Sequence, residues 1–220
     1  LSSLQGLKSV ILESNAKDIP LPGLSLEWLK SLPKSITKLV LNYSNAEMAW
    51  MDSRQRLAFN NFIVGTPSPS TGISAPLARY YPNLVHFEME TLSNPQWTAF
   101  MPDLILFEFP ATLETLGIHG TDRWQDTHWK SLPDSLTALG LSIKALSGTF
   151  LSRLTNLRTL KLASLTQCTN AQLAAIPRSV TSLDLGKVKF LDKRSNPSPL
   201  YLPPHLETLK VAKFETQSYA

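Results

Sequence analysis

Residues Phe109–Ile118 read FPATLETLGI, and residues Leu132–Leu141, 23 positions later, read LPDSLTALGL. Both contain the pattern Leu-x-x-Leu-x-Leu, with isoleucine in the last place of the first copy. The fourth and sixth places are two residues apart, so they share one face of a β-strand, whereas all three apolar places do not share one face of a helix. The pattern therefore predicts a short strand with a turn leading into it.

The pattern recurs along the chain, and we call its first apolar residue the anchor. Eight anchors are present: Leu7, Ile36, Leu84, Leu113, Leu136, Leu157, Val180 and Leu206. Successive anchors are 21 to 29 residues apart, except for a step of 48 between the second and the third. Phe59, Phe62 and Val64 match the pattern near the middle of that step, so we expect a ninth, degenerate strand there. The sequence alone leaves open whether Phe59–Val64 is a true repeat strand.

Apolar residues also recur before the anchors, seven positions and three or four positions upstream. This spacing predicts a turn of helix on the side away from the strands. Proline follows the second of these residues in six copies, and its fixed φ and missing amide favour ending the helix and turning the chain. These pairs are Leu32-Pro33, Tyr81-Pro82, Phe109-Pro110, Leu132-Pro133, Ile176-Pro177 and Leu202-Pro203.

The repeated pattern resembles the leucine-rich repeat, whose units span about 20–29 residues. The resemblance covers residues 1–220 as one domain and implies an α/β fold. That fold is a right-handed solenoid, or horseshoe, with a parallel concave sheet of eight or nine strands and short convex helices. Such repeats usually carry asparagine eight places after the anchor. Only Asn15 fits here, while Leu165, Val188 and Phe214 occupy the place in other copies, so the sequence predicts an irregular member.

The sequence also predicts the local structure of several segments between the anchors. We expect short helix at Glu27–Lys30, the longest outer helix at Asn45–Ala58, an exposed loop at Gly65–Pro76, an outer segment at Asn94–Phe109 and a loop at Lys187–Pro199. Trp129 occupies a repeated core place. A repeat lies near each end and the sequence starts without methionine, so we expect a fragment of a longer chain.

Composition indicates an ordinary soluble protein of 220 residues, 43% hydrophobic, with a mean hydropathy of −0.06. No apolar run approaches the roughly 18 residues that a membrane span needs, and the first residues do not resemble a signal peptide. Cys168 is the only cysteine, so no internal disulfide can form, and a lone thiol favours a reducing, cytoplasmic compartment.

The sequence contains no recognisable motif for a catalytic, cofactor or metal site. The chain has no Gly-x-x-x-x-Gly-Lys, His-Glu-x-x-His or Gly-x-Ser-x-Gly sequence. Cys168 paired with a distant histidine is a conceivable nucleophile, but a buried thiol is the better interpretation. Four metal-type ligands, namely His119, Asp122, Asp126 and His128, match no standard spacing and favour a solvated loop. We expect no enzyme and no cofactor.

The concave face of the expected sheet is the candidate binding site. It carries the third, fifth and seventh places of each copy. The candidate residues are Lys38, Val40, His86, Glu88, Glu90, Thr115, Gly117, His119, Gly140, Lys161, Asp184 and Lys210. Glycine and alanine near the middle predict a bare floor that a partner's backbone can approach, although the same residues would also suit a solvated face without a ligand.

A non-catalytic protein-recognition module is the function that this architecture favours. The alternatives are a structural segment of a large assembly and, with least support, a nucleic-acid-binding surface. The pI of 9.2 and net charge of +4 suit the last, but only 17% of the residues are charged. Residues 1–143 carry 10 Lys or Arg and 13 Asp or Glu, while residues 144–220 carry 11 and 4. The basic half, with Lys161 and Lys210, predicts docking of an acidic segment of a protein partner.

Overall fold

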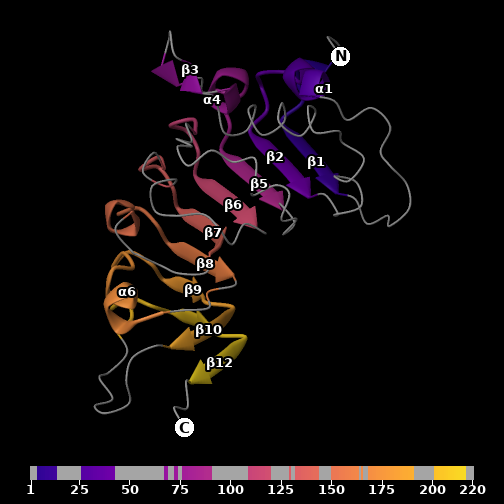
Figure 1. The fold of residues 1–220 in the computed structure, drawn as a ribbon. Coiled ribbons are helices and arrows are strands. Elements are labelled where there is room, and N and C mark those ends of the chain that lie inside the picture. Colours follow the sequence, from indigo (N-terminus) through magenta and orange to yellow (C-terminus); the bar gives the residue numbers. More distant parts are fainter. Residues whose placement is uncertain are drawn as a thin grey trace.

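The protein is described from a computed structural model of residues 1–220 (Figure 1). The residues described are 4–13, 26–42, 67–68, 72–73, 76–90, 109–119, 129, 132–143, 150–163, 165, 168–190 and 201–216. Eight of the described strands stack one after another in chain order, so position in the sequence becomes position along this stack.

The main element is an open sheet of eight parallel strands in the order β1-β2-β5-β6-β7-β8-β9-β11. This confirms the predicted parallel sheet. The strands are β1 (Ser9–Glu13), β2 (Lys38–Asn42), β5 (His86–Glu90), β6 (Thr115–His119), β7 (Ala138–Ser142), β8 (Thr159–Ala163), β9 (Ser182–Asp184) and β11 (Thr208–Lys210). Every one of them begins at the third place of its copy, two residues after the anchor.

The two faces of the sheet follow the predicted alternation. The fourth and sixth places point into the core, and we call this side the core face. In the inner strands these residues are almost completely buried; Leu139, for example, is 1% exposed and Leu141 is 0% exposed. The third, fifth and seventh places form the opposite side, which we call the polar face.

The remaining described elements are short. They are the helices α1 (Leu26–Ser31), α4 (Pro76–Tyr80), η3 (Leu151–Arg153) and α6 (Asn170–Ala174), and the hairpin strands β3 (Pro67–Ser68) and β4 (Gly72–Ile73). In Figure 1 the labelled helices lie beside the stacked strands. Helix α6 starts with a capping box, because Thr169 and Gln172 exchange side-chain and backbone hydrogen bonds. After most helical turns the chain reverses at proline; the carbonyl of Pro133, for example, accepts the amide of Leu136.

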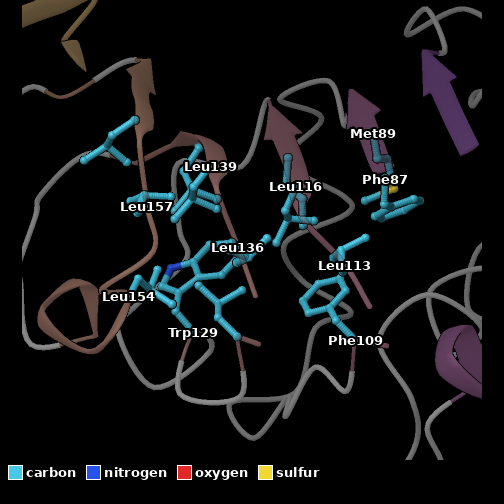
Figure 2. Close-up of a cluster of buried hydrophobic side chains, with 14 of the residues drawn as sticks. Phe87, Met89, Phe109, Leu113, Leu116, Trp129, Leu136, Leu139, Leu154 and Leu157 are labelled. Carbon is cyan, nitrogen blue, oxygen red and sulfur yellow. The ribbon is translucent and has the colours of Figure 1, made fainter. Parts of the chain in front are cut away.

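The core fills the space between the sheet and the returning segments (Figure 2). Aromatic residues occupy places outside the strands: Trp129 is 1% exposed and its ring centroid lies 6.2 Å from that of Phe150. Tyr81 is completely buried, and its hydroxyl donates to the carbonyl of Leu29 in α1. Burial raises the pKa of this hydroxyl far above its usual range, so it remains a donor at all ordinary pH values.

A ladder of side-chain hydrogen bonds, which we call the entry ladder, runs along the start of the strands. Its donors stand immediately before an anchor and bond to a carbonyl of the preceding repeat. Ser135 Oγ donates to the Leu113 carbonyl at 2.6 Å, and Thr112 Oγ1 donates to the Leu84 carbonyl at 2.9 Å. The other donors are Ser35, Asn83 and Asn156. The recurring polar residue before the anchor thus joins successive repeats.

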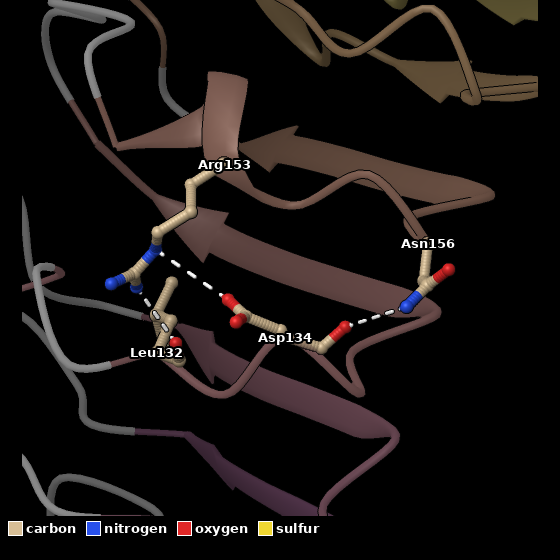
Figure 3. A network of polar contacts seen from close by, with 4 residues as sticks. All are labelled: Leu132, Asp134, Arg153 and Asn156. Atoms are coloured by element: carbon tan, nitrogen blue, oxygen red, sulfur yellow. Dashed lines mark hydrogen bonds and ion pairs between the residues drawn. The ribbon is translucent and has the colours of Figure 1, made fainter.

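Arg153 adds a second link at the same edge (Figure 3). Its Nη2 donates to the Leu132 carbonyl at 2.7 Å, and its Nε lies 3.6 Å from Asp134 Oδ1. The backbone carbonyl of Asp134 accepts from Asn156 Nδ2 at 2.9 Å. Because the ion pair is exposed, its contribution to stability is small, and the links to backbone carbonyls matter more.

The last repeats turn into a second sheet, where the sequence predicted only a loop. Strand β10 (Lys187–Phe190) pairs in parallel with β12 (Lys213–Thr216). Gly186 makes the bend with a φ of 55°, and its amide donates to Asp184 Oδ1 at 3.0 Å. Val188 pairs with Phe214 in this sheet, so two of the places that lack asparagine are occupied by strand residues.

The prediction of a ninth strand between the second and third copies is wrong. Strands β2 and β5 pair directly, with Lys38 opposite His86 and Asn42 opposite Glu90, so there is no room for a strand between them. Phe59–Val64 themselves lie outside the described residues, as do Asn45–Ala58 and most of Asn94–Phe109. The expected loop over Gly65–Pro76 contains the β3–β4 hairpin, and the expected helix at Glu27–Lys30 is confirmed as α1.

Candidate functional site

The polar face is continuous across all eight strands because their register is uniform. Residues in the fifth place form a row through successive register partners: Ile11, Val40, Glu88, Gly117, Gly140, Lys161, Asp184 and Lys210. All twelve candidate residues lie on these strands at the predicted places. The row starts apolar, passes one acidic residue and two glycines, and ends in two lysines separated by an aspartate.

Glu88 lies between two histidines in the middle part of the face, and we call this group the His–Glu–His cluster. Glu88 Oε2 is 3.6 Å from His86 Nε2, and Glu88 Oε1 is 3.9 Å from His119 Nε2. The cluster is partly open, because 37% of the Glu88 side chain, 27% of His86 and 21% of His119 are exposed. Strands β5 and β6 position it, since His86 and Glu88 are two residues apart on one strand and His119 ends the next.

Two paired glycines provide space for this cluster. A Cβ on Gly117 would lie 3.0 Å from Glu88 Cγ, and a Cβ on Gly140 would lie 3.1 Å from His119 Cε1. Gly117 and Gly140 are opposite each other on β6 and β7. The predicted bare floor is therefore wrong: the side chains of Glu88 and His119 lie over the two glycines, and a Cβ at either position would require these side chains to shift.

The electrostatic surroundings of His86 keep its imidazole neutral at pH 7. Burial lowers the pKa of His86, and the nearby Lys38 charge lowers it further, while the Glu88 carboxylate partly offsets both. Lys38 is the register partner of His86 on β2. The cluster therefore combines one carboxylate with an uncharged imidazole, and a lysine lies on its β2 side.

The basic end of the face lies apart from the cluster. Lys161 and Lys210 are exposed, whereas Asp184 between them accepts the Gly186 amide at the bend. Glu88, Gly117, Gly140 and Lys161 are successive register partners, so Lys161 is three strand spacings, about 14 Å, from Glu88. The structure thus divides the candidate residues into a His–Glu–His cluster and a lysine section.

Some candidate residues differ from their neighbours in accessibility. Val40 is 5% exposed, so it presents little surface to a partner. Thr115 is partly buried beside His86, and Glu90 is placed by its backbone at the end of β5. Of the expected loop ligands only His119 lies in the described part of the chain, and it belongs to the cluster.

The described residues contain neither an exposed thiol nor a metal-binding group. Cys168 is 0% exposed and packs in the core, as expected for a buried thiol. Among the described residues, no group of three or more His, Cys, Asp or Glu side chains could hold a metal ion. In the same part of the chain, no helix is long and apolar enough to cross a membrane.

The His–Glu–His cluster was not recognised from the sequence as a unit, although each member was a candidate. The available signal was the alignment of Gly117 with Gly140 in neighbouring copies, followed two residues later by His119. Comparisons with family models and with curated proteins find no match to this chain.

Proposed function

We propose that the chain is a leucine-rich-repeat solenoid that acts as a non-catalytic protein-recognition module through its polar face. The uniform register of eight parallel strands carries this proposal, since it aligns side chains from distant parts of the sequence on one extended surface. Repeated anchors, outer turns closed by proline and a core face of leucines support the repeat type. A surface of this form suits an extended segment of another protein.

The charge distribution supports a partner with an acidic segment. The stack changes from a balance of −3 over residues 1–143 to +7 over residues 144–220. On the polar face the exposed Lys161 and Lys210 lie in the basic half. Complementary charge steers association and selects partners more than it raises affinity, so binding should be fast and sensitive to salt.

Charge reversal on the polar face tests this proposal. The double variant Lys161→Glu/Lys210→Glu is compared with Lys34→Glu/Arg178→Glu, which makes the same change in net charge at two exposed residues outside that face. A partner captured saturably by the wild-type chain should still bind the control and should be lost by the first variant. Its affinity should also fall as salt rises toward 0.1 M and beyond, where the Debye length is about 10 Å or less. Equal retention by both folded variants would contradict docking at the lysine section.

The scaffold alternative rests on a different observation, at β11. The core-side residue Leu209 is 45% exposed and Val211, just after the strand, is 37% exposed, while Tyr201, a few residues earlier in the sequence, is 56% exposed. An apolar surface at the end of a sheet suits stacking against another structural unit. Cross-links to a neighbouring component through β11 and the outer turns, with none to the polar face, would favour a scaffold over recognition.

A further inference from the structure

We propose that the His–Glu–His cluster is a binding site for a guanidinium group, and that the arginine side chain of a protein partner is its ligand. The inference extends the proposed function by naming a second contact on the same face, about three strands from the lysine section. A partner segment crossing the strands would place an arginine over Glu88 and acidic residues over the lysines.

The carboxylate of Glu88 has unused capacity for hydrogen bonds. A carboxylate has about four lone-pair sites on its two oxygens. The histidine Nε2 atoms lie 3.6 and 3.9 Å from these oxygens, which is longer than a hydrogen bond. With 37% of the side chain exposed, both oxygens can accept from a ligand, and a guanidinium group matches the spacing of a carboxylate with two parallel N–H donors.

The surroundings favour guanidinium over ammonium. Imidazole rings lie near both oxygens, and the planar guanidinium stacks on aromatic rings and is more weakly hydrated than ammonium. Gly117 and Gly140 leave room for the His119 ring next to Glu88: a Cβ on Gly117 would be 3.4 Å from His119 Nε2.

Charges around the cluster determine how binding depends on pH. Lys38 on β2 opposes a cation and Glu88 on β5 attracts it, while His86 and His119 flank the carboxylate; β7 contributes the uncharged Gly140. At pH 7.5 His86 is neutral because its pKa is below the usual value. Protonation of His86 below its lowered pKa adds a positive charge beside the carboxylate, so the affinity for a cation should fall as the pH decreases.

The test is a titration with N-acetyl-arginine methylamide, followed by amide and imidazole NMR signals of the whole chain. At pH 7.5 we expect saturable shifts confined to Gly117, Gly140 and the two histidines. The neutral isostere N-acetyl-citrulline methylamide should give none, and N-acetyl-lysine methylamide should bind more weakly. Lowering the pH well below 6.5 should weaken arginine binding.

Three variants connect the shifts with the cluster. Glu88→Gln, which keeps the shape of the side chain, should weaken binding about tenfold or more, because the charge-assisted bonds are lost. Lys38→Gln should strengthen binding by removing a repulsive charge. Glu207→Gln removes an exposed carboxylate outside the polar face and should change nothing. Undisturbed spectra in the absence of ligand will show that each variant is folded.

Unchanged arginine binding by Glu88→Gln, or equal binding of the citrulline probe, would overturn the guanidinium site. These outcomes are separate from the failure of the proposed function. Protein recognition through the lysine section would survive them, because the probe titration uses the isolated chain. Conversely, the chain could bind the arginine probe although its polar face docks no protein. That result would support the guanidinium site and contradict a protein partner as the source of the arginine.

Discussion

The inner strand β7 and the last strand β11 have the same sequence pattern but different surroundings. In β7, Leu139 is 1% exposed and Leu141 is 0% exposed, whereas in and just after β11 the equivalent Leu209 and Val211 are 45% and 37% exposed. Strand β7 has paired strands on both sides, and β11 pairs with β9 alone in the main sheet. The repeat sequence alone therefore does not bury these places in β11, whereas β7 has a neighbouring strand on each side that covers them.

The largest expected effect contrasts these two strands. Leu139→Ala should lower the free energy of unfolding by roughly 2–5 kcal/mol, since it leaves a cavity in the core. Leu209→Ala, at a partly exposed place, should cost less than about 1 kcal/mol. Denaturant melts of both variants measure the difference, and Ala138, on the polar face, provides a tolerant position for comparison. Equal losses at Leu139 and Leu209 would contradict the difference in burial.

The next prediction concerns the bend before β10, which leads into the second sheet. In the described residues, the inner repeats have no counterpart of that sheet. Gly186→Ala should destabilise the chain by about 1–2 kcal/mol, because the residue has a φ of 55°. Gly6→Ala is the matched control: no atom lies within 4 Å of the place where its Cβ would be. Thermal unfolding that shifts equally for the two variants would show that the bend does not require glycine.

The entry ladder offers a smaller contrast between two serines in equivalent places. Ser135 Oγ donates to the Leu113 carbonyl, so Ser135→Ala should cost about 1 kcal/mol. Ser179 Oγ, in the described part of the chain, is buried and has no hydrogen-bond partner there. Ser179→Ala should be neutral or slightly stabilising, because no bond is lost and a buried polar group is removed. A larger loss at Ser179 than at Ser135 in denaturant melts would reverse this expectation.

The smallest expected effect concerns His86 and pH. Its folded pKa is below the ordinary value of 6.5, so the unfolded chain binds more protons in the window below that value. Stability contributed by neutral His86 is present at pH 7 and decreases as the pH falls through 6.5 toward 5. The loss between pH 7 and pH 5 should therefore be smaller in His86→Gln than in wild type. Identical losses would show that His86 does not titrate differently in the folded state.

The positions of the strands were predictable because the pattern fixes both period and phase. Each strand starts two residues after its anchor, and two-residue alternation then assigns every side chain to a face. The prediction of a ninth strand failed because spacing alone cannot distinguish a strand from other apolar segments. Ala58 precedes Phe59, where most other copies have a polar side chain that can join the entry ladder.

The chemistry of the site was less predictable than its location. The sequence correctly places Gly117 and Gly140 on the polar face, but it does not predict that side chains lie over them. The direction of the His119 ring across the neighbouring strand depends on tertiary packing. The second sheet was missed for a similar reason. Lys187–Phe190 is too short to show a clear period, and its partner β12 is distant in sequence.

Site-specific photo-crosslinking can determine whether protein partners bind to the polar face, as we propose. A benzophenone-bearing residue is placed at Thr159, which is exposed at the start of β8 on that face, or at Thr155, which is exposed in the preceding turn. The two sites are only four residues apart but lie on different surfaces. We predict that a saturable protein partner is captured from Thr159 and not from Thr155. Capture from Thr155 alone would contradict recognition through the polar face.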